Sequence, residues 1–282
     1  DMSLVADITN GVSTYEVAPG FDKIPAIARK YGLTVMVGAK VDGDKAGPGS
    51  DEQQMSTVIR LAKENRNVTR VIVGNEQILT NSMPVDQVIA DIKKVKAGVP
   101  KRVLVSTGET MDAWLKYPEL VDSVDFICVH ILPYWDQVPI GKAVDEVFSQ
   151  LDKLRAKYPG KPVLLGEVGW PSDGPWRGGA EPSIVNQATF MRTFLNRAKD
   201  EGIDYNAFEA FDQPWKRADG GPAEASWGIF DAQRHLKYPM QGSLVELKNW
   251  PKLCAISAVI ALPFMLWFSA RRRDIKATGL GF

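Results

Sequence analysis

The sequence has few histidines and cysteines, and its charges cancel. Its 282 residues include two histidines and two cysteines, and 34 basic residues balance 34 acidic ones. Two histidines cannot build a three-histidine zinc site, no HExxH pattern occurs, and neither Cys128 nor Cys254 lies in a metal-ligand spacing. Without a basic excess, the chain has no field to hold nucleic acid. We therefore expect no metal, no cofactor, no nucleic-acid partner and a neutral substrate.

The chain also lacks a basic and apolar signal peptide at its start, whereas a long apolar run lies near its end. Residues 253–270 are apolar except for Ser257 and Ser269. Trp250 and Trp267 lie where interfacial aromatic residues belong, and the run is followed by four basic residues, Arg271, Arg272, Arg273 and Lys276. The run predicts a transmembrane helix, with the preceding domain outside the cytoplasm. A buried C-terminal helix is the alternative.

Short β-branched runs alternate with helical stretches along the rest of the chain, which is typical of βα units in a parallel sheet. Seven strands are predicted, over residues 11–15, 33–38, 70–73, 102–107, 125–130, 162–167 and 205–211. Two of them, around Val71 and Leu164, are continuously apolar, as expected for strands buried on both faces. Helical periodicity between strands, for example at 144, 147, 148, 151 and 154, predicts faces that cover the sheet.

Seven such units indicate a (β/α)8 TIM barrel that lacks its first strand in this chain, followed by a transmembrane helix. Residues 1–9 then form the end of a helix that precedes the first visible strand. The predicted domains are a barrel over 1–245, a juxtamembrane linker over 246–252, a membrane helix over 253–270 and a cytoplasmic basic tail over 271–282. An open doubly wound sheet is the alternative, but no GxGxxG occurs at a first βα turn.

Two glycine-flanked glutamates end strands of this predicted barrel. Glu76 closes the third strand in Gly74-Asn75-Glu76, and Glu167 closes the sixth within residues 166–172. The carboxyl ends of parallel barrel strands share one rim, which is where barrel enzymes have their active sites. A pair of carboxyl groups across a sugar is the machinery of glycoside hydrolysis. We therefore predict Glu76 and Glu167 as two catalytic carboxylates that face each other across the barrel mouth.

The amino-acid sequence around these glutamates resembles that of glycoside hydrolase family 17, the β-1,3-glucanases and β-1,3-glucanosyltransferases. The similarity rests on four segments within residues 1–240, namely VIVGNE and LLGEVGWPS at the glutamates, VHILPYW at 129–135 and FEAFDQPWK at 208–216, with Thr14-Tyr15 at a strand end. By that resemblance Glu76 is the general acid/base, Glu167 is the nucleophile and Asn75 binds the hydroxyl beside the anomeric carbon. Tyr134 is expected to donate to Glu167 and keep it ionised.

The remaining predicted substrate contacts follow strand ends. Tyr15 and His130 are expected at the rim, although His130 can equally be a structural histidine. Asp212 and Lys216 are expected to bind sugar hydroxyls. Aromatic residues that can stack on sugar rings, or else pack between barrel and helices, are Trp135, Trp170, Trp215 and Trp227.

The chain departs from the family pattern at two points. The first barrel strand is absent, and relatives commonly have arginine where this chain has Ser13. A guanidinium there would help to keep the nucleophile ionised, so its loss is expected to raise the pKa of Glu167 or to remove a sugar contact.

These features predict a membrane-tethered, extracytoplasmic enzyme, periplasmic in a Gram-negative bacterium, that hydrolyses or transfers β-1,3-glucan through a covalent glycosyl-enzyme. The resemblance also suggests a membrane glycosyltransferase in the same polypeptide as a partner. A different class of function is a non-catalytic β-glucan-binding module of a membrane glucan synthase. A phosphate-handling barrel enzyme is disfavoured, because no GxxxxGK phosphate loop occurs.

Overall fold

The computed structural model describes residues 1–43, 49–244 and 249–271 of the chain. It divides into two compact units, residues 1–242 and residues 243–282. Residues 246–248 of the predicted juxtamembrane linker lie outside the described residues, as does the predicted basic tail beyond Arg271.

The first unit contains one parallel sheet whose strands follow the order of the sequence. Its strands are β1 (Gly11–Ser13), β2 (Thr34–Ala39), β3 (Val68–Asn75), β4 (Leu104–Thr110), β5 (Ile127–His130), β6 (Val163–Val168) and β7 (Asp204–Ala207). Every neighbouring pair is parallel, as the alternation of strand-like and helical segments predicted. All seven predicted strands are therefore confirmed.

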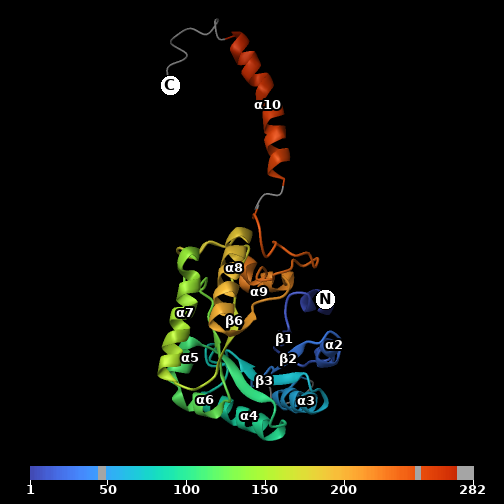
Figure 1. Ribbon diagram of the computed structural model, residues 1–282, viewed down its shortest axis with the longest axis vertical. Coiled ribbons are helices and arrows are strands. Elements are labelled where there is room, and N and C mark those ends of the chain that lie inside the picture. The colour runs from blue at the N-terminus through green and yellow to red at the C-terminus, as the bar shows by residue number, and fades with distance from the viewer. Residues whose placement is uncertain (44–48, 245–248, 272–282) are drawn as a thin grey trace. The chain divides into compact units, whose positions relative to one another are not determined.

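Helices alternate with these strands and surround the sheet (Figure 1). The larger ones are α3 (Asp51–Glu64), α4 (Val85–Gly98), α7 (Ile140–Lys157) and α8 (Ile184–Glu201). The shorter ones are α1 (Met2–Ala6), η1 (Phe21–Lys23), α2 (Ile24–Lys30), α5 (Met111–Lys116), α6 (Pro118–Ser123), η2 (Pro214–Lys216) and α9 (Arg217–Glu224). The short helix predicted before the first strand is α1.

The helices bury the faces that their periodicity predicts. In α7 all five residues named above are buried, since they recur every three to four positions along one face. The ends of α8 are fixed locally, because the Ser183 hydroxyl accepts from the Asn186 amide at 3.0 Å and Gly202 adopts a left-handed conformation after the last turn. The capping residues Ser183 and Gly202 therefore mark where α8 begins and ends.

Apolar strand residues form the centre of the sheet. One buried cluster combines side chains from or next to β2, β3, β5 and β6: Met36, Ile72, Phe126, Cys128 and Leu164. Strands that are not neighbours share this cluster, which is what happens when a sheet curls into a barrel. Within the described residues no pairing joins β1 to β7, so the TIM-like barrel is nearly closed, with seven strands. This agrees with the predicted barrel that lacks one strand.

The last strand is shorter than predicted. The sequence suggests a strand over 205–211, but β7 ends at Ala207. Beyond it the chain leaves β6 and pairs with a later segment, because Glu209 donates its amide to the Trp227 carbonyl at 3.2 Å and accepts from the Ile229 amide at 2.9 Å. The apolar residues 208–211 therefore belong to the loop after β7 and not to the strand.

The second unit contains one described helix, α10 (Trp250–Arg271), which holds the predicted apolar run. By length and composition it can cross a membrane, and its side chains are exposed within the structure. The helix predicted at this place is therefore present, and its insertion in a membrane stays a prediction.

A glycine on β2 sets how closely the first loop approaches the sheet. A Cβ at Gly38 would lie 2.3 Å from the Thr14 carbonyl oxygen and 2.8 Å from the Tyr15 Cα. We expect Gly38→Ala to lower the free energy of unfolding by about 1–3 kcal/mol, because backbone atoms must shift to admit the methyl group. Gly141→Ala is the control, since nothing lies within 4 Å of a Cβ there. Equal melting temperatures for the two variants would contradict this account.

Candidate active site

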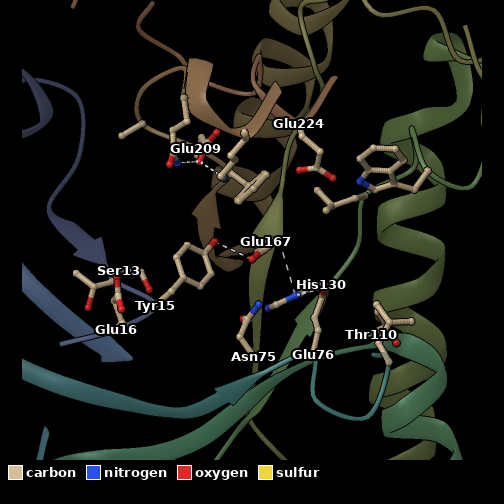
Figure 2. Close-up of a pocket in the computed structure, with 18 of the residues that line it drawn as sticks. Ser13, Tyr15, Glu16, Asn75, Glu76, Thr110, His130, Glu167, Glu209 and Glu224 are labelled. Carbon is tan, nitrogen blue, oxygen red and sulfur yellow. Dashed lines mark hydrogen bonds and ion pairs between the residues drawn. The ribbon is translucent and has the colours of Figure 1, made fainter. Parts of the chain in front are cut away.

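A cleft of about 2130 Å³ lies at the carboxyl ends of the strands. Its lining includes both predicted catalytic glutamates, and Tyr15, Asn75 and His130 beside them (Figure 2). This is the rim at which barrel enzymes bind substrate. The fold therefore brings the two glutamates together, as the sequence predicts.

The two glutamates reach the cleft in different ways. Glu167 belongs to β6 and is 6% exposed. Glu76 follows β3 directly and has a φ of 58°, in the left-handed region that residues other than glycine rarely adopt. Its amide donates to the Gly108 carbonyl at 2.8 Å, which ties it to β4. Glu167 is thus held by a strand and Glu76 by a turn.

His130 connects the two carboxylates. Its Nδ1 lies 3.0 Å from Glu76 Oε1 and 3.8 Å from Glu167 Oε2. A shift in the β5–β6 register, after Val129, places His130 opposite Glu167. Two glycines leave room for the ring, since a Cβ at Gly108 or Gly166 would lie 2.7 Å or 2.9 Å from its Nε2. One ligand atom from each of Glu76, His130 and Glu167 lies within 4.8 Å of the others.

Tyr15, and not Tyr134, donates to Glu167. The Tyr15 hydroxyl lies 2.7 Å from Glu167 Oε1, and Figure 2 shows its ring directed at that carboxylate. Tyr134 is buried and donates instead to the Pro175 carbonyl at 2.7 Å. The predicted Tyr134 bond is therefore wrong, because the Tyr134 hydroxyl bonds to the Pro175 carbonyl and the hydroxyl at Glu167 belongs to Tyr15. Tyr134 does not line the cleft.

Burial dominates the electrostatics of this cluster. It raises the pKa of Glu167, and the Glu76 carboxylate adds to the rise, while His130 opposes it. Burial lowers the pKa of His130, but Glu167 and the hydrogen bonds to Cys128 and Glu76 together raise it well above its usual value. Burial and Glu167 also raise the pKa of Tyr15. These directions favour a protonated imidazole at His130 and a Tyr15 hydroxyl that keeps its proton.

The same trio has the donor set of a divalent metal site. Two carboxylates and an imidazole are ligands that zinc accepts. In this structure their oxygen and nitrogen atoms contact one another, and Tyr15 occupies one oxygen of Glu167. Each of the three side chains thus has a hydrogen-bond or ion-pair partner within the cluster, and such contacts are also what proton transfer requires.

A third carboxylate in the cleft, buried like Glu167, was missed from the sequence. Glu209, 7% exposed, accepts from Lys216 Nζ at 3.0 Å and from the Gln213 side-chain amide. Burial raises its pKa to about 7, although Lys216 and Gln213 oppose the rise. Glu209 lies in the segment 208–216, two residues after β7. A carboxylate directly after a barrel strand is a candidate for the active site, and this position could have identified it. Lys216, predicted as a sugar contact, lines the cleft as the partner of Glu209.

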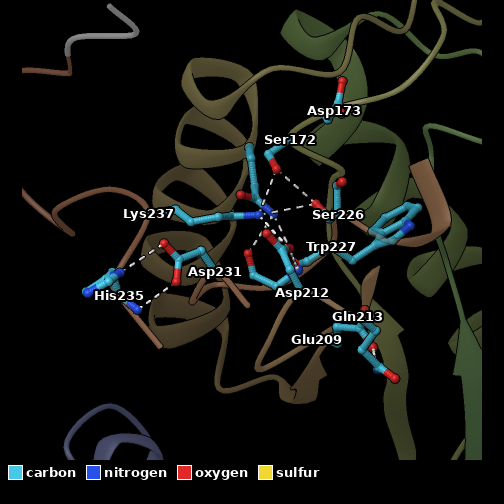
Figure 3. Close-up of polar contacts among 12 residues, drawn as sticks. Ser172, Asp173, Glu209, Asp212, Gln213, Ser226, Trp227, Asp231, His235 and Lys237 are labelled. Atoms are coloured by element: carbon cyan, nitrogen blue, oxygen red, sulfur yellow. Dashed lines mark hydrogen bonds and ion pairs between the residues drawn. The ribbon is translucent and has the colours of Figure 1, made fainter. Parts of the chain in front are cut away.

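Asp212 joins three loops beside the cleft. Its Oδ1 accepts from the Gly228 amide at 2.8 Å and from Lys237 Nζ at 2.9 Å (Figure 3). Lys237, itself buried, also donates to Ser172 Oγ at 2.7 Å and to the Ser226 carbonyl at 3.3 Å. Asp212 also borders the cleft. Through Lys237, Asp212 is therefore linked to Ser172 in the loop after β6.

The predicted aromatic residues divide into two sets. Trp135 and the 65%-exposed Trp215 line the cleft. Trp170 is 0% exposed, stacks on Phe190 and donates Nε1 to the Glu181 carbonyl at 3.0 Å, and Trp227 is buried as well. Trp170 therefore has no free face for a sugar ring, and the packing alternative holds for it and for Trp227.

Ser13 lies in the cleft near Tyr15, where relatives were expected to carry arginine. The positive charges that act on Glu167 come from other elements, His130 on β5 and Lys216 in η2. Burial is the largest cause of the raised pKa of Glu167, so the expected effect of the missing arginine stays a prediction.

We expect Glu209→Gln to change how stability depends on pH. The folded-state pKa of Glu209 is about 7, above its ordinary 4.5, so its contribution is complete below pH 4.5 and is lost as pH rises through 7. The loss amounts to about 3 kcal/mol by linkage. In urea titrations of the detergent-solubilised chain, Glu209→Gln should lose less unfolding free energy between pH 4.5 and 8 than the unmodified protein.

The exposed Glu119 gives the matched control, Glu119→Gln, which should follow the unmodified protein. If the Glu209→Gln stability curve also ran parallel to that of the unmodified protein, the assignment of the raised pKa to Glu209 would be wrong.

A family model described as the BtgE/BtgC glycoside hydrolase domain matches residues 1–228. A glucan 1,3-beta-glucosidase of Schizosaccharomyces pombe is 25% identical over 254 residues, which cover 84% of this chain and 78% of that protein. A probable glucan endo-1,3-beta-glucosidase of Aspergillus clavatus is also 25% identical, but the chain covers 38% of its length.

Solved structures agree with this. The family 17 β-1,3-glucanosyltransferase of Rhizomucor miehei is 27% identical, with a TM-score of 0.74 over 86% of this chain and 90% of that one. An active-site mutant of the R. miehei β-1,3-glucanosyltransferase in complex with laminaritriose is 26% identical, with a TM-score of 0.75. The chain therefore belongs to the BtgE/BtgC glycoside hydrolase domain family, and its resemblance to glycoside hydrolase family 17 is confirmed.

Proposed function

We propose that this protein is a retaining enzyme that acts on β-1,3-glucan, with Glu76 and Glu167 as its catalytic pair. The family supports a glycosidase or transglycosylase, and the similar proteins are named for β-1,3-glucan substrates. The R. miehei structure in complex with laminaritriose supports a linear β-1,3-gluco-oligosaccharide as the substrate class here.

One observation carries the mechanism, namely the short separation of the two carboxylates. An oxygen of Glu76 and an oxygen of Glu167 lie within 4.8 Å of each other. Inverting enzymes need roughly 6.5–9.5 Å between carboxyl groups to admit a water, whereas retaining enzymes have about 5–5.5 Å. The separation favours direct attack by one carboxylate on the sugar.

In the first step Glu167 attacks the anomeric carbon. The bond between that carbon and the glycosidic oxygen breaks, and Glu76 gives its proton to the leaving oxygen. In the second step Glu76, now a carboxylate, removes a proton from water or from a sugar hydroxyl, which attacks the anomeric carbon and releases Glu167. Water yields hydrolysis, and a sugar yields a longer glucan.

His130 and Tyr15 support this pair. Tyr15 donates to the carboxylate that must stay ionised to attack, and it opposes the rise in pKa of Glu167 that burial causes. His130 contacts both carboxylates, so its positive charge compensates whichever one is ionised. Neither residue needs to bond covalently to the substrate.

The cleft offers further groups to a glucan chain. Asn75 precedes Glu76 at the rim and can donate to the hydroxyl next to the anomeric carbon. Trp135 and Trp215 offer aromatic faces to sugar rings, and Lys216 a cationic donor to hydroxyls. A cleft of about 2130 Å³ has room for several sugar rings and not only for one.

We also propose that α10 tethers the enzyme to a membrane, with the barrel unit on the extracytoplasmic side. The support is a helix of 22 residues with an apolar composition and tryptophans near both ends. In a Gram-negative cell that side is the periplasm. A membrane glycosyltransferase in the same polypeptide would then act next to this domain on the same glucan.

The assignment of the pair predicts the outcome of a product analysis. We would incubate the detergent-solubilised chain with reduced linear β-1,3-gluco-oligosaccharides and follow the products by mass spectrometry. Glu76→Gln and Glu167→Gln should each lower turnover by at least about 10³-fold, because each removes a group that acts in the transition state. Glu119→Gln, at an exposed carboxylate, should keep full activity.

Products longer than the substrate would identify a transglycosylase, and shorter products alone a hydrolase. Retention is read from the anomeric configuration of the first product by nuclear magnetic resonance. An α-configured first product would overturn the retaining mechanism. Unchanged substrate with detectable binding would instead favour a non-catalytic glucan-binding module.

The membrane tether is tested by fractionation of cells that express the chain. We expect the full chain to remain in membranes after an alkaline carbonate wash, because a spanning helix resists it. Deletion of residues 250–271 should release the barrel unit into the soluble fraction. A full chain that leaves the membrane in carbonate would contradict the proposed span.

A further inference from the structure

The turn that carries Glu76 is fixed by three consecutive residues of β4. The Thr107 hydroxyl donates to the Gly74 carbonyl at 3.2 Å. The Gly108 carbonyl accepts from the Glu76 amide at 2.8 Å, and Glu109 Oε1 accepts from the Ile78 amide at 2.9 Å. Of these three contacts, only the one to Glu109 uses a charged group.

This turn requires an external hold. Glu76 and Gly74 have φ values of 58° and 78°, and such a conformation at Glu76 persists only when its surroundings impose it. Outside β4, the Gln77 side-chain amide donates to the Val41 carbonyl at 2.7 Å, and within the turn Thr80 Oγ1 donates to the Glu76 carbonyl at 2.7 Å. The β4 contacts are therefore the ones that tie the backbone of the turn to the neighbouring strand.

Glu109 is an unusual residue for a purely structural anchor. It is 0% exposed, and its Oε2 is buried without a hydrogen-bond partner within the described part of the chain. A buried carboxylate is costly unless it is fully paired. Burial accordingly raises its pKa to about 7, while its bonds to the Ile78 and Leu79 amides oppose the rise. It does not line the cleft, so it cannot touch a substrate.

We propose that Glu109 is a positioning residue for the acid/base Glu76, which it holds in place through the turn at Ile78. The inference rests on the proposed function. Glu109 aims Glu76 at the glycosidic oxygen, while the attack by Glu167, held on β6, does not depend on it.

This division of roles has a chemical signature. When Glu167 attacks and the glycosidic bond breaks, a sugar leaving group must take a proton from Glu76, but a 2,4-dinitrophenolate leaves without one. In the second step Glu76 must take a proton from water, but azide attacks as an anion and needs no base. A misplaced Glu76 therefore slows the reaction of a natural substrate and spares the reaction of dinitrophenyl laminaribioside in azide.

We would compare Glu109→Ala and Glu109→Gln in the full detergent-solubilised chain. For Glu109→Ala we expect kcat on laminari-oligosaccharides to fall by about 100-fold, the size of effect known for a small misplacement of a catalytic group. Its rate on 2,4-dinitrophenyl β-laminaribioside with azide should change by less than about threefold, since that reaction needs neither the acid nor the base. Glu109→Gln keeps an oxygen for the Ile78 amide and should recover most of the lost activity.

Controls separate this inference from the proposed function. Glu76→Ala must show the same dependence on the leaving group and the same azide rescue. If it does not, the assignment of Glu76 fails. If Glu76→Ala shows the pattern but Glu109→Ala loses both reactions equally, or neither, the positioning role is overturned. Should Glu109→Ala not fold, Glu109→Asp answers the same question, because it keeps the charge but is one methylene too short for Ile78.

Discussion

The structure depends on keeping three charged side chains together in a buried place at the strand ends. Glu76, His130 and Glu167 come from β3, β5 and β6, and each offers an atom within 4.8 Å of the others. A buried charge is tolerated only when it is paired and hydrogen-bonded. The barrel meets this need by supplying His130 from β5 and the Tyr15 hydroxyl from the loop after β1. The same enclosure raises the pKa of Glu167, and His130 and Tyr15 oppose that rise.

Close approach of backbone segments makes this enclosure possible. Glycines at 38, 108 and 166 stand where any side chain would collide with Tyr15 or with the His130 ring. Each lies in or next to a strand that carries a site residue, so the glycines that weaken strands in general are needed here for local packing. Register shifts at the same strand ends turn Asn75 and His130 toward the rim. The register shifts therefore set where the site residues lie along their strands, and the glycines leave room for their side chains.

Much of this could be predicted from the sequence, because it follows from local pattern. The seven strands, the covering face of α7 and the meeting of Glu76 with Glu167 depend on periodicity and on the common direction of parallel strands. The partner of Glu167 could not be predicted, since whether Tyr15 or Tyr134 turns inward depends on loop geometry. The sequence predicted that Trp170 stacks on a sugar ring, but the fold of the loop after β6 buries it. No local sequence pattern marks Glu109 as a positioning residue, because it acts on the turn that follows β3, which is distant in the sequence.

The charge balance of the cleft suits the reaction better than it suits a bound neutral sugar. Glu76, Glu167 and Glu209 face the positive charges of His130 and Lys216 across a short distance. A glucan carries no charge, but the transition state of glycosidic cleavage develops positive charge on the sugar ring. Carboxylates already fixed around that ring stabilise the transition state without having to reorganise. Because Ser13 carries no charge, the positive charges that act on Glu167 are those of His130 and Lys216.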